Sequence, residues 1–169
     1  LFLAVYNGAS ATLQPLCSVN LGAGCYQRVR QFFHLGVKTV LVASGLFVLV
    51  GELFPRVIVG IFTEPTPQVV SMAVYAIRIY FIAYLPMGIN IITSTFHQSL
   101  ESFREATLIS LARGLIFLVP ALFLLGEVFG VNGIWATVPV CEGLTLLLSV
   151  LLLRRLFAAR FPEESSSAL

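Results

Sequence analysis

Three long stretches of the sequence, residues 1–27, 79–100 and 114–126, contain no Asp, Glu, Lys or Arg. An apolar helix of about twenty residues crosses the ~30 Å hydrocarbon core of a bilayer. Each stretch either approaches that length or is separated from a longer one by a single charge. Charged residues are 11% of the 169 residues and apolar residues 58%, so the polar shell of a soluble globule cannot be built. The sequence predicts a polytopic membrane protein and excludes the familiar classes of soluble enzyme.

Glycine and proline turn signals divide the chain into five expected membrane-spanning helices. The fold class is therefore an all-α membrane helix bundle, in one domain over residues 1–153. Residues 56–62 are too short to span and are expected at the interface, and residues 154–169 form a tail that we expect to fray. Because the chain begins inside an apolar run, we expect it to be a piece of a longer protein. The expected helices cover about residues 1–21, 32–53, 69–96, 106–126 and 133–153.

The basic side chains predict the orientation of these helices. Five spans place their connections alternately on two sides, and Lys and Arg concentrate on the cytoplasmic side of membrane proteins. One side holds only Arg56, and the side that holds the tail is therefore expected to be cytoplasmic. That side carries Arg28, Arg30, Lys38, Arg104, Arg154, Arg155 and Arg160.

Metal and nucleic-acid partners are not expected. The net charge is only +2, which is no footprint for nucleic acid. Cys17, Cys25 and Cys141 have no CxxC spacing, and His34 and His97 have no second ligand nearby in the sequence. Buried inert thiols are the simpler interpretation of the cysteines.

Two charged residues lie deep in the expected helices, at similar depths. Glu142 is about 15 Å from either end of its helix, and Arg113 is about 10 Å from the cytoplasmic end of the preceding one. A short hairpin joins these helices, so they are antiparallel neighbours. An unpaired carboxylate at that depth costs several kcal/mol, and we expect Glu142 to pair with Arg113 inside the bundle. Arg78 lies nearer the outer face, has no partner evident in the sequence, and is expected to snorkel.

The predicted pair is open to three interpretations. It could be a static structural bridge, an element linked to proton binding or conformational change, or a snorkelling arginine beside an unrelated carboxylate. The second interpretation makes Glu142 and Arg113 the candidates for ion coupling and transport.

Prolines interrupt four of the five expected spans, at Pro15, Pro86, Pro120 and Pro139. Each removes a backbone donor and leaves the carbonyl four residues earlier without its partner. Kinked helices beside a hydrated cavity are typical of transporters, although proline is also simply commoner in membrane helices. Four prolines in five spans favour a moving, cavity-lining bundle.

Uncharged polar side chains form stripes along the helices. Such stripes are typical of hydrogen bonding between helices, and equally of a hydrated substrate path. Gln14, Asn20, Tyr84 and Asn90 are the candidates to line a cavity. The stripes comprise Asn7, Ser10, Gln14 and Ser18, then Asn90, Thr93, Ser94 and His97 below the Tyr80–Tyr84 pair, and finally Thr145 and Ser149 on the face of Glu142.

Residues 14–24, Gln-Pro-Leu-Cys-Ser-Val-Asn-Leu-Gly-Ala-Gly, resemble the QPL-x-x-x-N-x-GA stretch of bacterial multidrug and toxic compound extrusion (MATE) exporters. Further similar segments follow in the order of that family. They are Arg28-Val29, Phe54-Pro55, Ile61-Phe62-Thr63, Arg78-Ile79, Pro86-Met87-Gly88-Ile89-Asn90, Phe96-His97-Gln98, Ser110-Leu111-Ala112-Arg113 and residues 130–139.

The resemblance implies a twelve-span protein with two six-helix lobes around a central cavity. It implies a secondary antiporter rather than an enzyme, which exports drugs and organic cations in exchange for H⁺ or Na⁺ and has no cofactor besides that coupling ion. The five helices would be spans 8–12, in the C-terminal lobe. The expected partners are cationic or amphipathic drugs, membrane lipid and the N-terminal lobe of the same protein, in the cell inner membrane.

The sequence also departs from the family pattern. Ion-coupling members carry carboxylates on the first and fourth helices of this lobe, and residues 69–96, the fourth, contain no Asp or Glu. Gly114, Ser99 and Glu101 replace residue types common in relatives, whereas Glu142 matches a position where relatives often carry an acid. Two alternatives remain open: a flippase for lipid-linked precursors with a related two-lobe build, and an intramembrane hydrolase, which needs a catalytic set beyond Glu142.

Overall fold

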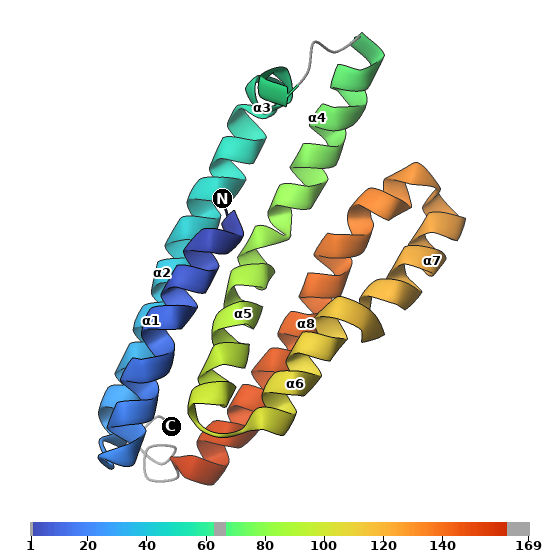
Figure 1. Ribbon diagram of the computed structural model, residues 1–169. Helices are drawn as coiled ribbons and strands as arrows, with labels where there is room; N and C mark the ends of the chain where they lie inside the picture. Colours follow the sequence, from blue (N-terminus) through green and yellow to red (C-terminus); the bar gives the residue numbers. More distant parts are fainter. Residues whose placement is uncertain (1, 63–66, 162–169) are drawn as a thin grey trace, which may run out of the picture.

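The computed structural model describes residues 2–62 and 67–161, and every regular element among them is a helix. The elements run side by side as an elongated bundle (Figure 1). Their bounds are α1 Phe2–Gly22, α2 Tyr26–Leu53, α3 Pro55–Phe62, α4 Pro67–Ile82, α5 Tyr84–Ser99, α6 Phe103–Leu111, the π-helix η1 Ala112–Ile116, α7 Leu118–Phe129 and α8 Val131–Arg160.

Helix α5 is the centre of the bundle. It lies between the α1–α2 pair on one side and the α6–α8 pair on the other (Figure 1). Its side chains are buried on nearly every face from Ile92 to Phe96. The core joins α1, α2, α5 and α8 and includes Tyr6, Val29, Phe33, Val40, Ile92 and Phe96. Polar groups on α5 therefore have neighbours on all sides, and in an apolar environment a group without a hydrogen-bond partner costs free energy.

Four helical stretches are long and apolar enough to cross a membrane: Tyr26–Leu53, Pro67–Ser99, Phe103–Phe129 and Val131–Arg160. The predicted all-α membrane helix bundle is confirmed. Helix α1, the remaining expected span, is 21 residues long but is not among these four. Its polar side chains, including Asn7, Gln14 and Asn20, dilute its apolar character.

The connections alternate between the two ends of the bundle. The α1–α2 and α5–α6 links lie at the same end as the close of α8, while α3 and the α7–α8 turn lie at the other (Figure 1). Two boundaries differ from the expectation, because α2 begins at Tyr26 and α8 continues to Arg160. The expected tail is thus helical over its first turns. Residues 56–62, expected as an interfacial segment, lie in the short helix α3.

Two of the four prolines lie inside continuous helices, and the other two lie just after a break in a helix. Pro15 and Pro139 lie inside continuous helices. Pro86 lies in the first turn of α5, just after the break at Ala83 that splits one expected span into α4 and α5. Pro120 lies in the first turn of α7, just after η1. At the end of η1 the amide of Phe117 donates to the carbonyl of Ala112 at 2.9 Å. This bond reaches back five residues, as in a π-helix.

The α7–α8 hairpin is closed by glycines. Gly130 has φ +59, a left-handed conformation that glycine adopts without strain, and it separates the two helices. A Cβ at Gly133 would overlap the carbonyl oxygen of Leu125. The absence of a side chain there allows α7 and α8 to approach closely, as small residues do in membrane helix pairs.

Candidate functional site

The carboxylate of Glu142 is the buried charge around which the candidate site is built. Glu142 lies on α8 and is 3% exposed. Its Oε1 accepts a hydrogen bond from Nε of Arg113 at 2.5 Å, which is also the ion pair. The two residues are 29 positions apart, and the α7–α8 hairpin brings them together. The contact predicted from their depths in the sequence is present in the structure.

Asn90 is the second partner of this carboxylate. It lies on α5 and is fully buried, and its Nδ2 donates to Oε2 of Glu142 at 2.8 Å and to the Glu142 backbone carbonyl at 3.0 Å. Ser149, two turns further along α8, donates from Oγ to Oδ1 of Asn90 at 3.0 Å. Since Ser149 occupies the amide oxygen, the amide nitrogen must face Glu142. Both carboxylate oxygens therefore have a donor.

Arg113 connects the buried carboxylate to the surface of the bundle. Its side chain is 28% exposed, whereas that of Glu142 is 4% exposed. It uses one N–H toward Glu142 rather than the two-pronged geometry that arginine commonly offers a carboxylate. Its backbone carbonyl accepts from Sγ of Cys141 at 3.1 Å. Two consecutive residues of α8 thus bind Arg113, Cys141 at its backbone carbonyl and Glu142 at its side chain.

Arg113 lies within the π-helix, and this position has a structural consequence. A π-helix holds one extra residue in a turn and occurs mostly as a single turn, often at functional sites. Pro120 accompanies it, because proline leaves the carbonyl of Ile116 without its usual α-helical donor. The widened turn separates α6 from α7, which do not share one straight axis in Figure 1.

The chemistry available to this site is that of a single neutralised carboxylate. The Glu142 carboxylate pairs with Arg113 through one oxygen and accepts from Asn90 through the other, and Ser149 in turn holds Asn90. Among residues 2–62 and 67–161, no group of three or more His, Cys, Asp or Glu side chains is placed to hold a metal ion. The partners of the Glu142 carboxylate are a cation and an amide, and a hydroxyl holds that amide; none of these is a second acid or an activated nucleophile.

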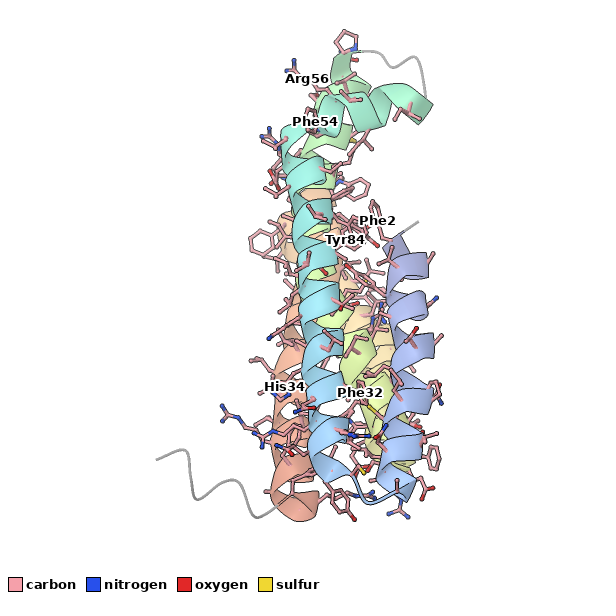
Figure 2. The ribbon with its side chains drawn as sticks, turned by 90° about the vertical axis from the view of Figure 1, so that its left-hand side faces the viewer. Phe2, Phe32, His34, Phe54, Arg56 and Tyr84 are labelled. Atoms are coloured by element: carbon pink, nitrogen blue, oxygen red, sulfur yellow. The ribbon has the colours of Figure 1, made fainter. Side chains whose placement is uncertain are left out.

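A second polar junction joins α1, α2 and the start of α5. The Tyr6 hydroxyl lies 2.8 Å from Oγ of Ser44 and donates to the carbonyl of Tyr84 at 3.0 Å. Oγ of Ser44 lies 2.6 Å from the carbonyl oxygen of Val40 and 3.0 Å from that of Tyr84. The Tyr84 ring packs against Phe2 and Phe81, with ring centroids 4.5 Å and 5.1 Å away. Figure 2 shows Tyr84 and Phe2 together at the same level of the bundle. Tyr84, expected to line a cavity, therefore lies in an aromatic cluster.

The other candidates to line a cavity have separate positions. Gln14 is exposed on α1, and Asn20 is half-buried and donates from Nδ2 to the Leu16 carbonyl of its own helix at 2.8 Å. A mainly apolar groove of about 330 Å³ lies between α1 and α2, and none of the four candidates is among its lining residues. The groove is lined chiefly by small side chains, including Ala4, Gly8, Thr12 and Gly36. Of the four candidates, Asn90 is the one that contacts Glu142.

The expectation for Arg78 changes, and the structure places the two histidines. Arg78 is not simply snorkelling, because its Nε lies 3.7 Å from Oε2 of Glu52, with both side chains partly exposed. His97 is fully buried in the bundle, and its Nδ1 lies 2.8 Å from the carbonyl of Thr93. His34 is exposed, and its Nδ1 lies 2.7 Å from the carbonyl of Arg30 (Figure 2).

Fold and site together describe a multi-pass membrane protein with a buried, paired carboxylate, and comparison with known proteins gives its family. The sequence model of the MatE family matches residues 1–123. The chain belongs to this family, and the resemblance noted in the sequence is confirmed.

Individual relatives are similar over most of this chain. It is 30% identical over 138 residues to a FAD transporter of Shewanella oneidensis, covering 82% of this chain and 30% of the relative. It is 26% identical over 153 residues to multidrug export protein MepA of Staphylococcus haemolyticus, covering 88% and 33%. It is 25% identical over 120 residues to MepA of Staphylococcus aureus, covering 69% and 26%. The chain thus spans about a third or less of these relatives. No solved structure matches significantly.

Proposed function

We propose that this chain is part of a secondary antiporter that exports small organic molecules across the cell inner membrane in exchange for H⁺ or Na⁺. The observation that carries the proposal is the buried Glu142 carboxylate with its single, partly exposed arginine partner. Membership of the MatE family and similarity to multidrug export proteins support the transport role.

A carboxylate of this kind can link ion binding to a conformational change. When Glu142 is ionised, Arg113 is held against α8 by the ion pair. A proton or Na⁺ on the carboxylate would break the ion pair with Arg113. The contact between the Cys141 thiol and the Arg113 carbonyl would then remain between α8 and η1. A ligand shifts an equilibrium between two states by its differential affinity for them. Export would follow from the two states facing opposite sides of the membrane.

The proposed topology places the end of α8 and its basic residues in the cytoplasm. This rests on the excess of Lys and Arg at the end of the bundle formed by the α1–α2 link, the α5–α6 link and the close of α8. The remaining spans of the transporter would complete the path for the transported molecule.

The experiment is transport by the intact protein in proteoliposomes, with ethidium as a cationic substrate and FAD as an anionic one. One relative is named a FAD transporter and others are named multidrug export proteins, so an anionic and a cationic substrate are compared, and we propose the cation. Glu142→Gln keeps the shape of the side chain and removes its charge. We expect at least a tenfold loss of ethidium transport driven by a pH or Na⁺ gradient, which corresponds to about 1.4 kcal/mol or more.

The matched control is Glu127→Gln, an exposed carboxylate on the neighbouring helix α7. It should transport as the unmodified protein does. Ion-driven transport by Glu142→Gln equal to that of the control, at every pH and Na⁺ concentration, would remove Glu142 from the coupling mechanism. Uptake of FAD with no transport of ethidium would overturn the proposed substrate class.

A further inference from the structure

Asn90 is hydrogen-bonded through both of its side-chain polar atoms, as a buried polar side chain requires. Its Nδ2 donates twice to Glu142, and its Oδ1 accepts from Ser149. The side chain of Asn90 is fully buried, and Ser149 is 1% exposed. Water therefore cannot substitute for either contact without rearrangement of the core.

The order of these bonds fixes the direction of the amide. If the Asn90 side chain rotated by half a turn, its oxygen would meet the Glu142 carboxylate and its nitrogen would meet Ser149. Two oxygens without a proton between them repel, whereas an N–H donated to a carboxylate stabilises the ionised form. The Ser149 hydroxyl keeps the amide in the favourable orientation because it can donate to Oδ1.

We infer that Asn90, oriented by Ser149, is a positioning residue that holds the Glu142 carboxylate by hydrogen bonds and so influences the pH dependence of ion-driven transport. This rests on the proposed function, because it assigns Glu142 the coupling role. Asn90 acts through Glu142 and Ser149 acts through Asn90.

Other ionisable groups also face Glu142 from the elements packed around it. Arg113 pairs with it from η1, Cys141 precedes it on α8, and the Tyr6 hydroxyl interacts with it electrostatically from α1. On α5, His97 lies two turns, about 10 Å, beyond Asn90. Asn90 and Ser149 carry no charge themselves, so their removal changes hydrogen bonding to the carboxylate without changing the net charge of the site.

The test measures ethidium transport by the intact protein in proteoliposomes from acidic to alkaline pH. Asn90→Ala removes the donor to Oε2 of Glu142, so the carboxylate loses one of its hydrogen bonds, and the transport profile should move toward alkaline pH by about one unit. Ser149→Ala should move it in the same direction by less, because the amide is then free to rotate. The control Thr137→Val removes a buried hydroxyl of α8 that donates to the carbonyl of Gly133 at 3.0 Å, and it should leave the profile in place.

A double variant separates positioning from general damage to the core. If Ser149 acts through Asn90, Ser149→Ala should have no further effect on the profile in the Asn90→Ala background. Ser149→Ala keeps Asn90 and the shape of the core, so it tests the inference even if Asn90→Ala fails to fold. A profile of Ser149→Ala that matches that of Thr137→Val would overturn the inference.

The transport measurements distinguish failure of the positioning role of Asn90 from failure of the coupling role of Glu142. If Glu142→Gln abolishes ion-driven transport while Ser149→Ala and Asn90→Ala keep the unmodified profile, the coupling role stands and the positioning role is wrong. If Glu142→Gln keeps transport and its pH profile, both proposals fail together.

Discussion

The thiol of Cys141 donates to the backbone carbonyl of Arg113 at 3.1 Å, and the next residue, Glu142, pairs with the side chain of the same arginine. Two consecutive residues of α8 therefore hold the π-helix at one point. Arg113 therefore contacts α8 through both its side chain and its main chain.

Arg113→Ala should destabilise the protein, and Arg113→Ala with Glu142→Gln should recover most of the loss. Removing one partner of a buried pair costs about 3–5 kcal/mol. Because Arg113 is 28% exposed, water can reach Glu142 in its place, and we expect about 2–3 kcal/mol. Thermal unfolding in nanodiscs would measure this, with Arg104→Ala, an exposed arginine of α6, as control. A double variant no more stable than Arg113→Ala would contradict the idea of an uncompensated carboxylate.

Deletion of Gly114 should leave the helix bundle folded but break the contact between Arg113 and Glu142. A π-helix contains one residue more than the α-helical turn that it replaces, so the deletion restores a regular helix and keeps the register of α6 and α7. Gly114 is exposed, and a side chain there would meet nothing within 4 Å. Arg113 should leave Glu142, and ion-driven ethidium transport should fall at least tenfold.

The control for that deletion is removal of Leu124, an exposed residue inside the regular helix α7. There the deletion turns the following part of α7 by about 100° and disrupts its packing on α8. Membrane yield and size-exclusion profile should remain normal for the Gly114 deletion and deteriorate for the Leu124 deletion. The reverse order would show that the π-helix is needed for folding.

Gly133→Ala should destabilise the α7–α8 hairpin, and Gly143→Ala on the same helix should not. A Cβ at Gly133 would overlap the carbonyl oxygen of Leu125, whereas one at Gly143 would meet nothing within 4 Å. Overpacking costs about 1–3 kcal/mol, and here the obstacle is backbone, so we expect the upper end. Equal thermal stability of the two variants would show that the helices separate without loss.

Tyr6→Phe should weaken the junction of α1, α2 and α5 by about 0.5–1.5 kcal/mol, the usual net value of a hydrogen bond. Ser44 keeps its own bond to the carbonyl of Tyr84, which limits the loss. Tyr75→Phe, at an exposed tyrosine of α4, is the control. Thermal unfolding should separate the two variants, and a Tyr6→Phe protein as stable as the control would show that the hydroxyl is dispensable.

The sequence predicted those features that depend on local pattern or depth. Apolar length indicated the helices, and the depths of Arg113 and Glu142 across a short hairpin predicted their contact. Both arguments use only rise per residue and the shortness of the link. The polar stripe on the expected helix 69–96 indicated that Asn90 faces inward, without saying which helix it meets.

Features that depend on distant packing were not predictable in this way. The pairing of Asn90 with Glu142 and Ser149 joins α5 to α8, which are parallel rather than sequential neighbours. The contact of Arg78 with Glu52 likewise requires knowing that α4 packs on α2. The position of Pro120 seven residues after Arg113 could have suggested an irregular turn, but proline alone does not distinguish a kink from a π-helix.

The separation of Arg113 from its acid has a consequence for how the chain enters a bilayer. Synthesis runs from the N-terminus, so Arg113 leaves the ribosome before Glu142, which follows 29 residues later. An arginine alone at the centre of an inserting helix costs about 2.5–3.5 kcal/mol. Insertion of α6, η1, α7 and α8 as one unit avoids that cost, because the arginine then reaches the lipid already neutralised.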